Sequence, residues 1–229
     1  LGDVACTGEA YGQARARLPI AVLRQLSDGI VTQLRGVHDA VGRWRGHRTF
    51  TIDGTSASMP DTPALQKQYG QPNTQAVGLG FPVMHLLAMF DATTGFLLKI
   101  VSAPYRTHDM SQTPYLHPEL AEGDILLGDR GFASFAHLAV LAARKAFGVF
   151  RAHQRQLVDF TPGRPHGGTG RPTSRWLKKL GKLDQLVEYV KPESRPNWLS
   201  ETEFATLPKT LVVRELSYRV EVPGWRSRT

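Results

Sequence analysis

The spacing of apolar residues changes along the chain from helical to strand-like. In residues 17–34, four apolar side chains recur at intervals of three or four positions, and Pro19 suits the first turn of a helix. These side chains are Leu23, Leu26, Ile30 and Leu34. Residues 46–53 instead form a short β-type run, GHRTFTID, which ends in an acid and precedes a turn-rich stretch. The pattern predicts a helix over residues 17–34 and a first strand over residues 46–53.

Further strands and one helix are predicted in the middle of the chain. Residues 81–101 are predicted to form two strands joined around DATTG, as an antiparallel hairpin. Residues 125–127 are apolar without alternation, a pattern typical of a strand buried on both faces in a parallel arrangement. Ser134 is a suitable N-cap for a helix that ends before Gly148, and residues 148–153 are predicted to form a further strand.

The order of these elements predicts the class of fold. Three strands are followed by a short helical stretch near residues 108–117, then by a strand, a helix and a strand. This order gives two antiparallel connections and then a β–α–β crossover. We therefore expect an α/β fold on one mixed sheet with flanking helices. The expected divisions are an N-terminal helical segment (1–45), a core with the first five strands (46–153) and a β-rich region (154–229).

Beyond residue 153 the sequence becomes loop-like, basic and rich in proline. Residues 211–222 then alternate in the manner of a half-exposed strand. One face carries the apolar side chains Val212, Leu216, Tyr218, Val220 and Val222, and the other carries the polar side chains Glu215, Ser217, Arg219 and Glu221. Because only a turn follows this strand, we expect its pairing partner to lie beyond residue 229.

Composition narrows the class of partner. The 229 residues carry a formal net charge of +8, and this basic excess favours nucleic acid or another polyanion. The single Cys6 cannot form an internal disulfide, which favours a reducing compartment. The longest uncharged apolar stretch, residues 76–90, is too short to span a bilayer, and no export signal is evident. We expect a cytoplasmic protein without a membrane partner, and a fragment of a longer chain, because it begins with Leu.

Two carboxylates stand at the ends of predicted strands. Asp53 ends the run TFTID, and Asp129 ends the run DILLGD. The carboxyl ends of neighbouring strands form the crevice of an open α/β sheet, so these side chains can converge there. A hard divalent cation such as Mg²⁺ relieves the repulsion between two carboxylates and keeps open positions for water and phosphate oxygens. The alternative is that each Asp only caps a turn or a helix, and the pattern alone leaves both interpretations open.

Basic side chains crowd residues 151–182, against the single acid Asp159. They are Arg151, Arg155, Arg164, Arg171, Arg175, Lys178, Lys179 and Lys182. Together with the glycine-rich GGTGRP, they predict a strip that contacts DNA phosphates, and the alternative is a solvated charged face. Arg130 directly follows the second acid. It either contacts a phosphate or neutralises Asp129 or Asp124, and the sequence does not choose between these roles.

Four aromatic or imidazole side chains indicate function less specifically. Trp176 and Trp198 are interpreted as packing anchors, with stacking on a nucleic-acid base as the alternative. His108 and His153 are candidate ligands or phosphate donors. Since no second His or Cys stands at a zinc-like spacing, we expect no zinc site.

A family resemblance joins these observations. The motifs TIDGTSASMPDTP and DILLGDRGF, in this order, resemble the first two acidic motifs of bacterial DDE-type transposases of the insertion sequence 4 family. Residues 11–19, 149–160 and 195–220 resemble further segments of the same transposases, so the resemblance covers nearly the whole chain. It implies an RNase H-like core with a β-rich insertion after the fifth core strand, in which Asp53 and Asp129 ligate Mg²⁺ or Mn²⁺.

The chain departs from the family pattern at the third acid. That acid is a Glu in a motif of Tyr, two residues, Arg, three residues, Glu, six residues and Lys. Tyr189 is followed at the Arg position by Pro192, and Tyr218 is followed there by Glu221. Glu215 is a poor substitute because it lies on the polar face of its predicted strand. We therefore expect truncation before the last core helix and an inactive chain when it is alone.

The resemblance implies cut-and-paste transposition. The expected reaction is metal-dependent hydrolysis of a phosphodiester at the transposon ends, followed by transfer of the strand into target DNA. The expected partner is double-stranded DNA, with a homodimer assembled on it. The expected DNA-binding residues are Arg130, Arg151, His153, Arg155, Arg171, Arg175, Lys178 and Lys179. The alternatives are another RNase H-like nuclease, or an incomplete transposase that acts only by binding DNA or other subunits.

Overall fold

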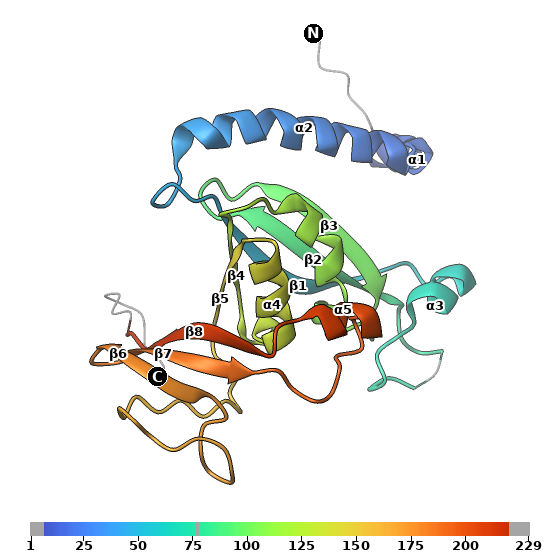
Figure 1. The fold of residues 1–229 in the computed structure, drawn as a ribbon. Coiled ribbons are helices and arrows are strands. Elements are labelled where there is room, and N and C mark those ends of the chain that lie inside the picture. Colours follow the sequence, from blue (N-terminus) through green and yellow to red (C-terminus); the bar gives the residue numbers. More distant parts are fainter. Residues whose placement is uncertain (1–6, 77, 220–229) are drawn as a thin grey trace. The chain divides into compact units, whose positions relative to one another are not determined.

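The computed structural model describes residues 7–76 and 78–219, without the side chains of residues 34–41. The chain divides into two compact units, Leu1–Gly46 and His47–Thr229 (Figure 1). In the described part of the chain, no helix combines the length and the apolar character needed to cross a bilayer.

The first unit is helical. Helix α1 (Gly8–Arg17) is capped by the Thr7 hydroxyl, which accepts a hydrogen bond from the backbone N–H of Ala10. Helix α2 (Ile20–Val41) follows Pro19, whose fixed φ suits the start of a helix. The helix predicted over residues 17–34 is therefore present but begins later and runs further, whereas α1 was not predicted.

The second unit contains a five-stranded sheet in the order β3-β2-β1-β4-β5 (the core sheet). Its strands are β1 (Thr49–Ser58), β2 (Val83–Asp91), β3 (Leu97–Pro104), β4 (Ile125–Gly128) and β5 (Phe147–Phe150). The strand β1 pairs antiparallel with β2 and parallel with β4, and β4 pairs parallel with β5. The expected α/β fold on one mixed sheet is confirmed.

Helix α4 (Phe135–Ala143) makes the crossover between β4 and β5 and lies against the core sheet (Figure 1). The Ser134 hydroxyl caps it by accepting from the backbone N–H of His137, as the sequence predicts. The buried face of the sheet contributes Phe50 and Ile52 to a core that also contains Leu141 of the helix. Because side chains alternate along a strand, Thr51 and Asp53 lie on the opposite face of β1.

Three segments differ from the sequence prediction. The stretch after Asp53, predicted to be a turn, continues β1 to Ser58, because its backbone pairs residue by residue with β2. It is followed by the unpredicted helix α3 (Pro63–Tyr69).

The helix predicted near residues 108–117 is three 3₁₀ turns, η1 (Asp109–Ser111), η2 (Thr113–Tyr115) and η3 (His117–Glu119). A further 3₁₀ turn, η4 (Arg130–Phe132), follows β4. Pro114 and Pro118 fit the first turn of a short helix, but each would interrupt a longer one.

A second, antiparallel sheet in the order β6-β7-β8 follows the core (the insertion sheet). It consists of β6 (Arg175–Gly181), β7 (Asp184–Val190) and β8 (Thr210–Leu216), with helix α5 (Glu201–Thr206) before its last strand. The strand predicted over residues 211–222 is thus β8, which pairs with β7. The expectation that its partner lies beyond residue 229 is wrong. The predicted positions from Val220 onwards lie outside the described residues.

The buried face of the insertion sheet mixes polar and apolar side chains, since Gln185 and Glu215 lie on it beside Val187. The carboxylate of Glu215 is only 7% exposed and accepts hydrogen bonds from Gln185, Gln156 and Tyr189, at 2.9, 3.1 and 3.0 Å. Burial and this carboxylate raise the pKa of Tyr189. On the opposite face of β8, Val212 is 64% exposed. Of the predicted polar face, Glu215 is therefore buried, since a network of hydrogen bonds satisfies it, whereas Ser217 and Arg219 are exposed.

Candidate active site

Asp53 and Asp129, both predicted to end strands, belong to one register of the core sheet. The parallel ladder pairs Thr49 with Ile125 and Thr51 with Leu127, so each pair is separated by 76 residues along the chain. Asp53 and Asp129 have the same separation, and the backbone at Asp129 remains extended beyond the end of β4. Continuation of the register by two residues therefore brings Asp53 beside Asp129, on the same face of the sheet.

A single pocket at this rim is lined by both acids. Its volume is about 490 Å³, and its lining residues are Thr51, Ile52, Asp53, Phe90, Leu127, Gly128, Asp129 and Arg151. Both carboxylates are exposed to solvent. Arg151, which directly follows β5, is the basic side chain of this pocket. Asp53 and Asp129 thus line one pocket as predicted, but only Asp129 follows the end of its strand, because β1 continues past Asp53 to Ser58.

Backbone N–H groups hold each carboxylate by one oxygen. The N–H of Gly54 donates to Oδ1 of Asp53 at 2.9 Å, and the N–H of Gly131 donates to Oδ1 of Asp129 at 2.7 Å. Asp129 thereby caps η4 through Oδ1, so the capping role considered as the alternative accounts for one of its two oxygens. Among the described residues, Oδ2 of each acid has no hydrogen-bonding partner. An oxygen of each acid is left for another ligand.

This donor set is compatible with one class of metal. Oxygen ligands at an exposed rim suit Mg²⁺, which is commonly bound by one or two carboxylates together with waters and substrate phosphates. Within the described ranges, no cluster of three His, Cys, Asp or Glu side chains is arranged to hold an ion. The residues fit a partly hydrated divalent ion, and they do not form an all-protein cage.

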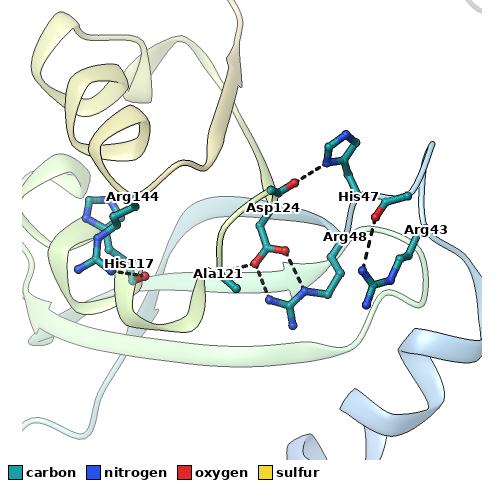
Figure 2. Close-up of polar contacts among 9 residues, drawn as sticks. Arg43, His47, Arg48, His117, Ala121, Asp124 and Arg144 are labelled. Carbon is teal, nitrogen blue, oxygen red and sulfur yellow. Dashed lines mark hydrogen bonds and ion pairs between the residues drawn. The ribbon is translucent and has the colours of Figure 1, made fainter.

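Arg130 is held away from the acids beside it in the sequence. Its NH1 donates to Oε1 of Gln154 at 3.0 Å. Asp124 is instead paired with Arg48, which donates from Nε and NH2 to the two carboxylate oxygens at 2.8 and 2.5 Å (Figure 2). Among the described residues, neither of the neutralising contacts considered for Arg130 is formed.

The basic residues of segment 151–182 have different environments. Arg155, Arg171, Lys178, Lys179 and Lys182 are exposed, as is Arg151 in the pocket. Arg175 is paired with Glu188 at 2.9 Å. His153 is half-buried, and its Nδ1 accepts from the backbone N–H of Arg155 at 3.2 Å.

Arg164 does not belong to the proposed strip, although the sequence placed it there. It is only 5% exposed, and its guanidinium donates to the carbonyl of Asp159 at 2.7 Å and to the carbonyl and hydroxyl of Ser174 at 2.8 Å each. Arg164 therefore closes the loop that precedes β6, and it is too deeply buried to contact a DNA phosphate.

The tryptophans lie in packed positions. Trp198 packs against the core and against the cluster that joins α4 to the insertion sheet, and its ring meets His137 edge-on, with centroids 6.4 Å apart. Trp176 is half-buried on β6, opposite Val187. His108 caps η1, since its Nδ1 accepts from the N–H of Met110 at 3.2 Å. The contacts of Trp198 agree with its interpretation as a packing anchor, whereas the buried indole N–H of Trp176 has no hydrogen-bonding partner among the described residues.

Two features of the core sheet could not be recognised in the sequence. Asp109 forms an ion pair with His85 and lies against Gly54, where an added Cβ would come within 2.5 Å of its Oδ1. An added side chain at position 54 would therefore displace the Asp109 carboxylate. The second feature is the pair of Arg48 and Asp124, because its members are separated by 76 residues.

Comparisons with known proteins agree with these observations. The family model described as the transposase DDE domain matches residues 44–222. Over 95 residues the chain is 38% identical to the putative transposase InsZ of Escherichia coli (strain K12). The aligned segment covers 40% of this chain and 31% of that protein. The chain thus spans about a third of the curated relative that it matches.

A solved structure shares part of the chain at low similarity. The piggyBac transposase in a cryo-EM synaptic complex with hairpin DNA aligns with a TM-score of 0.32 and 17% identity, over 62% of this chain and 30% of that chain. The strand order of the core sheet, with Asp53 on the first strand and Asp129 after the fourth, is the order expected of an RNase H-like core. Since the family model covers well over half of the sequence, the chain belongs to the transposase DDE domain family.

Proposed function

We propose that this chain carries the catalytic core of a DNA transposase. Its reaction is metal-dependent hydrolysis of phosphodiester bonds at transposon ends, followed by strand transfer into target DNA. One observation carries the proposal: in a member of this family, the register of β1 and β4 brings Asp53 and Asp129 to one rim, where both line one pocket.

In this proposal Asp53 and Asp129 hold Mg²⁺ or Mn²⁺ through the oxygens that the backbone leaves free. A divalent ion bound there supplies positive charge that stabilises the negative charge developing on the phosphate during displacement. The N–H groups of Gly54 and Gly131 orient the two carboxylates, so that both remain fixed when substrate enters.

Arg151 is the residue best placed to contact the DNA phosphate that enters the pocket. Arg130 stands at the same rim with its guanidinium oriented by Gln154. The exposed members of the strip, namely Arg155, Arg171, Lys178 and Lys179, then follow the DNA backbone outside the pocket, with His153 and the ion-paired Arg175 beside them. Contacts of this kind fix the register of a protein on DNA without reading its sequence.

A second candidate function is binding without catalysis, as an incomplete subunit on DNA. The observation that favours it is the count of carboxylates: the described residues offer two acids at the rim and no third metal ligand there. In that case the chain occupies transposon ends, or pairs with complete subunits, and inhibits transposition.

Cleavage of a DNA duplex that carries the element's terminal inverted repeat tests the proposal. We expect Mn²⁺-dependent, site-specific nicking by the chain extended to include the Tyr–Arg–Glu–Lys motif, and none by its Asp129→Asn variant, whose DNA binding stays largely intact. Cleavage retained by Asp129→Asn would refute the assignment. Cleavage without preference for the repeat would indicate another RNase H-like nuclease. Binding without cleavage by both lengths would favour the second candidate.

A further inference from the structure

We propose that the ion pair between Arg48 and Asp124 is a register clamp, which holds β1 and β4 in the one alignment that brings Asp53 beside Asp129. Both members of the clamp are positioning residues for the acids. The inference rests on the proposed function only in giving the acids their role as metal ligands. The alignment itself is a structural property and can be tested separately.

The positions of Arg48 and Asp124 in the chain match the register of the two strands. Arg48 directly precedes β1, and Asp124 directly precedes β4. They are separated by 76 residues, as are Thr49 and Ile125 in the ladder and the two acids beyond it. The two parallel bonds from Nε and NH2 of Arg48 to the carboxylate oxygens form the two-pronged pairing that is most specific in geometry (Figure 2).

The ladder between β1 and β4 cannot specify its own register. It is short, and β4 is apolar at the three consecutive positions Ile125, Leu126 and Leu127. A shift of one residue moves every side chain to the other face of the sheet, and the register is strongly specified only where the two faces differ in polarity. Since β4 offers apolar side chains to both faces, hydrophobic burial does not distinguish the correct register from a shifted one.

The surroundings of Asp124 make a shifted register unfavourable. Asp124 is only 3% exposed, and its Oδ2 also accepts a hydrogen bond from the backbone N–H of Ala121 at 2.6 Å. A shift of the strands would separate the buried carboxylate from the guanidinium, and a buried charge without its partner is strongly destabilising. His47 adds a contact at the same offset, between its Nδ1 and the carbonyl of Gly123 at 2.6 Å.

The clamp acts at the opposite end of the strands from the acids. Five residues separate Arg48 from Asp53, a distance of roughly 16 Å along an extended strand. The backbone between them belongs to the core sheet, with Phe50 and Ile52 fully buried. An alignment fixed at the amino ends is therefore transmitted along a rigid strand to the rim that carries the acids.

The clamp variant is Arg48→Met with Asp124→Asn. It removes both charges, keeps an apolar stem over the ring of Phe50, and leaves an oxygen at position 124 to accept from the N–H of Ala121. The chain offers a matched control in Arg214 and Asp184. That pair has the same bonds, Nε to Oδ1 at 2.8 Å and NH2 to Oδ2 at 2.5 Å, but joins β8 to β7 in the insertion sheet. The control variant is Arg214→Met with Asp184→Asn.

Cross-linking measures the register without any metal. Asp53→Cys and Asp129→Cys are combined with Cys6→Ser, which removes the chain's single native cysteine. Dibromobimane then bridges the two thiols only when they are neighbours. We expect efficient bridging in this background, at least fivefold less with the clamp variant added, and a change of less than twofold with the control variant. Equal bridging in all three proteins would overturn the clamp.

Manganese affinity, measured by the EPR signal of free Mn²⁺, then links the clamp to the proposed function. We expect Asp53→Asn and Asp129→Asn to lose the bound ion, the clamp variant to bind at least tenfold more weakly, and the control variant to bind as the unmodified chain does. If neither acid variant changes Mn²⁺ binding, the proposed metal role fails. The cross-linking result still decides the clamp.

A conservative variant keeps the test decisive if the clamp variant does not fold, as checked by circular dichroism. Arg48→Lys leaves a cation for Asp124 but lacks the planar fork that makes two parallel bonds. We expect bridging between that of the unmodified background and that of the clamp variant. Bridging by folded Arg48→Lys at the full level of the background would overturn the proposal.

Discussion

The core sheet and the insertion sheet place their carboxylates in opposite ways. In the core sheet, parallel strands bury apolar side chains and bring Asp53 and Asp129 to an exposed rim, where each keeps an oxygen free. In the insertion sheet, antiparallel strands bury Glu215 and satisfy it with Gln185, Gln156 and Tyr189.

Parallel strands with all their carboxyl ends at one edge concentrate chemistry there, whereas an antiparallel pair of strands has no such edge. An acid with a free oxygen at a rim is available to a ligand, and an acid enclosed by donors stabilises the fold. We therefore expect the chemistry at the acids of the core sheet and a structural role for the acid of the insertion sheet.

The largest expected effect is a difference in DNA cleavage between variants of Asp53 and Glu215. Asp53→Asn is expected to reduce Mn²⁺-dependent cleavage below detection in the extended protein, because an amide is a poor ligand for the ion. Glu215→Gln is expected to retain cleavage, since it keeps the shape and an acceptor for two of its three donors. Gel assays of nicked duplex check both. Activity in Asp53→Asn, or its loss in folded Glu215→Gln, would reverse the roles given to the two acids.

The next effect concerns the boundary between the two sheets, where two buried imidazoles meet. His117 and His137 lie with their Nε2 atoms 3.1 Å apart, and burial lowers the pKa of His117 to about 3 and that of His137 to about 4. Both remain neutral in the folded protein, whereas the unfolded chain binds protons near the ordinary pKa of 6.5. Stability is therefore fully present above pH 6.5 and falls as the pH is lowered towards 4.

The change expected from His137 alone is roughly 3 kcal/mol across this range. Urea unfolding at pH 7, 6, 5 and 4 measures it. A variant with Phe at both positions, His117→Phe with His137→Phe, is expected to lose most of this dependence on pH. A slope of stability against pH that does not change in that variant would show that other groups are responsible.

A smaller effect is expected on stability when the buried acid is removed. Glu215→Ala leaves three donors without their acceptor, which should lower the free energy of unfolding by about 2 to 3 kcal/mol. Asp53→Ala, at an exposed position, should change it by about 0.5 kcal/mol or less. Val212→Thr is the control on the exposed face of the same strand as Glu215, with a similarly small expected change. Chemical denaturation with a common baseline measures all three, and a larger loss in Asp53→Ala than in Glu215→Ala would contradict the comparison.

The smallest effect distinguishes two arginines of the insertion region. Arg171→Ala, at an exposed position, should remove one phosphate contact and lower the slope of log affinity against log salt by about 0.9, without a change in stability. Arg164→Ala should leave the slope unchanged and destabilise the loop, because the carbonyls of Asp159 and Ser174 each lose the guanidinium as a donor. The carbonyl of Asp159 keeps its hydrogen bond from the amide of Gln185. Fluorescence anisotropy of labelled duplex across a salt series, together with thermal unfolding, separates these outcomes. A changed slope in Arg164→Ala would return that residue to the DNA-binding strip.

The parts of the structure that local patterns determine could be predicted from the sequence. The apolar run before Asp129 and the cap at Ser134 specify a strand and a helix by themselves, and a strand-end acid needs no distant partner to be recognised. These signals predict the mixed sheet and the acid rim.

The features that distant partners determine could not be predicted. Burial of Glu215 depends on Gln156 and Gln185, which are 59 and 30 residues away in the chain, so alternation alone suggested the opposite face. Burial of Arg164 depends on how one loop closes on Ser174. The pairing of Arg48 with Asp124 forms only after the strands have aligned, and no local sequence pattern predicts it.

A crystal structure of the chain with Mn²⁺, with the ion located by its anomalous scattering, tests whether Asp53 and Asp129 share a metal ion. We expect an anomalous peak at the rim, with an oxygen of Asp53 and an oxygen of Asp129 each about 2.1 Å from it. A peak bound elsewhere, or two carboxylates too far apart to share an ion, would refute the shared metal site.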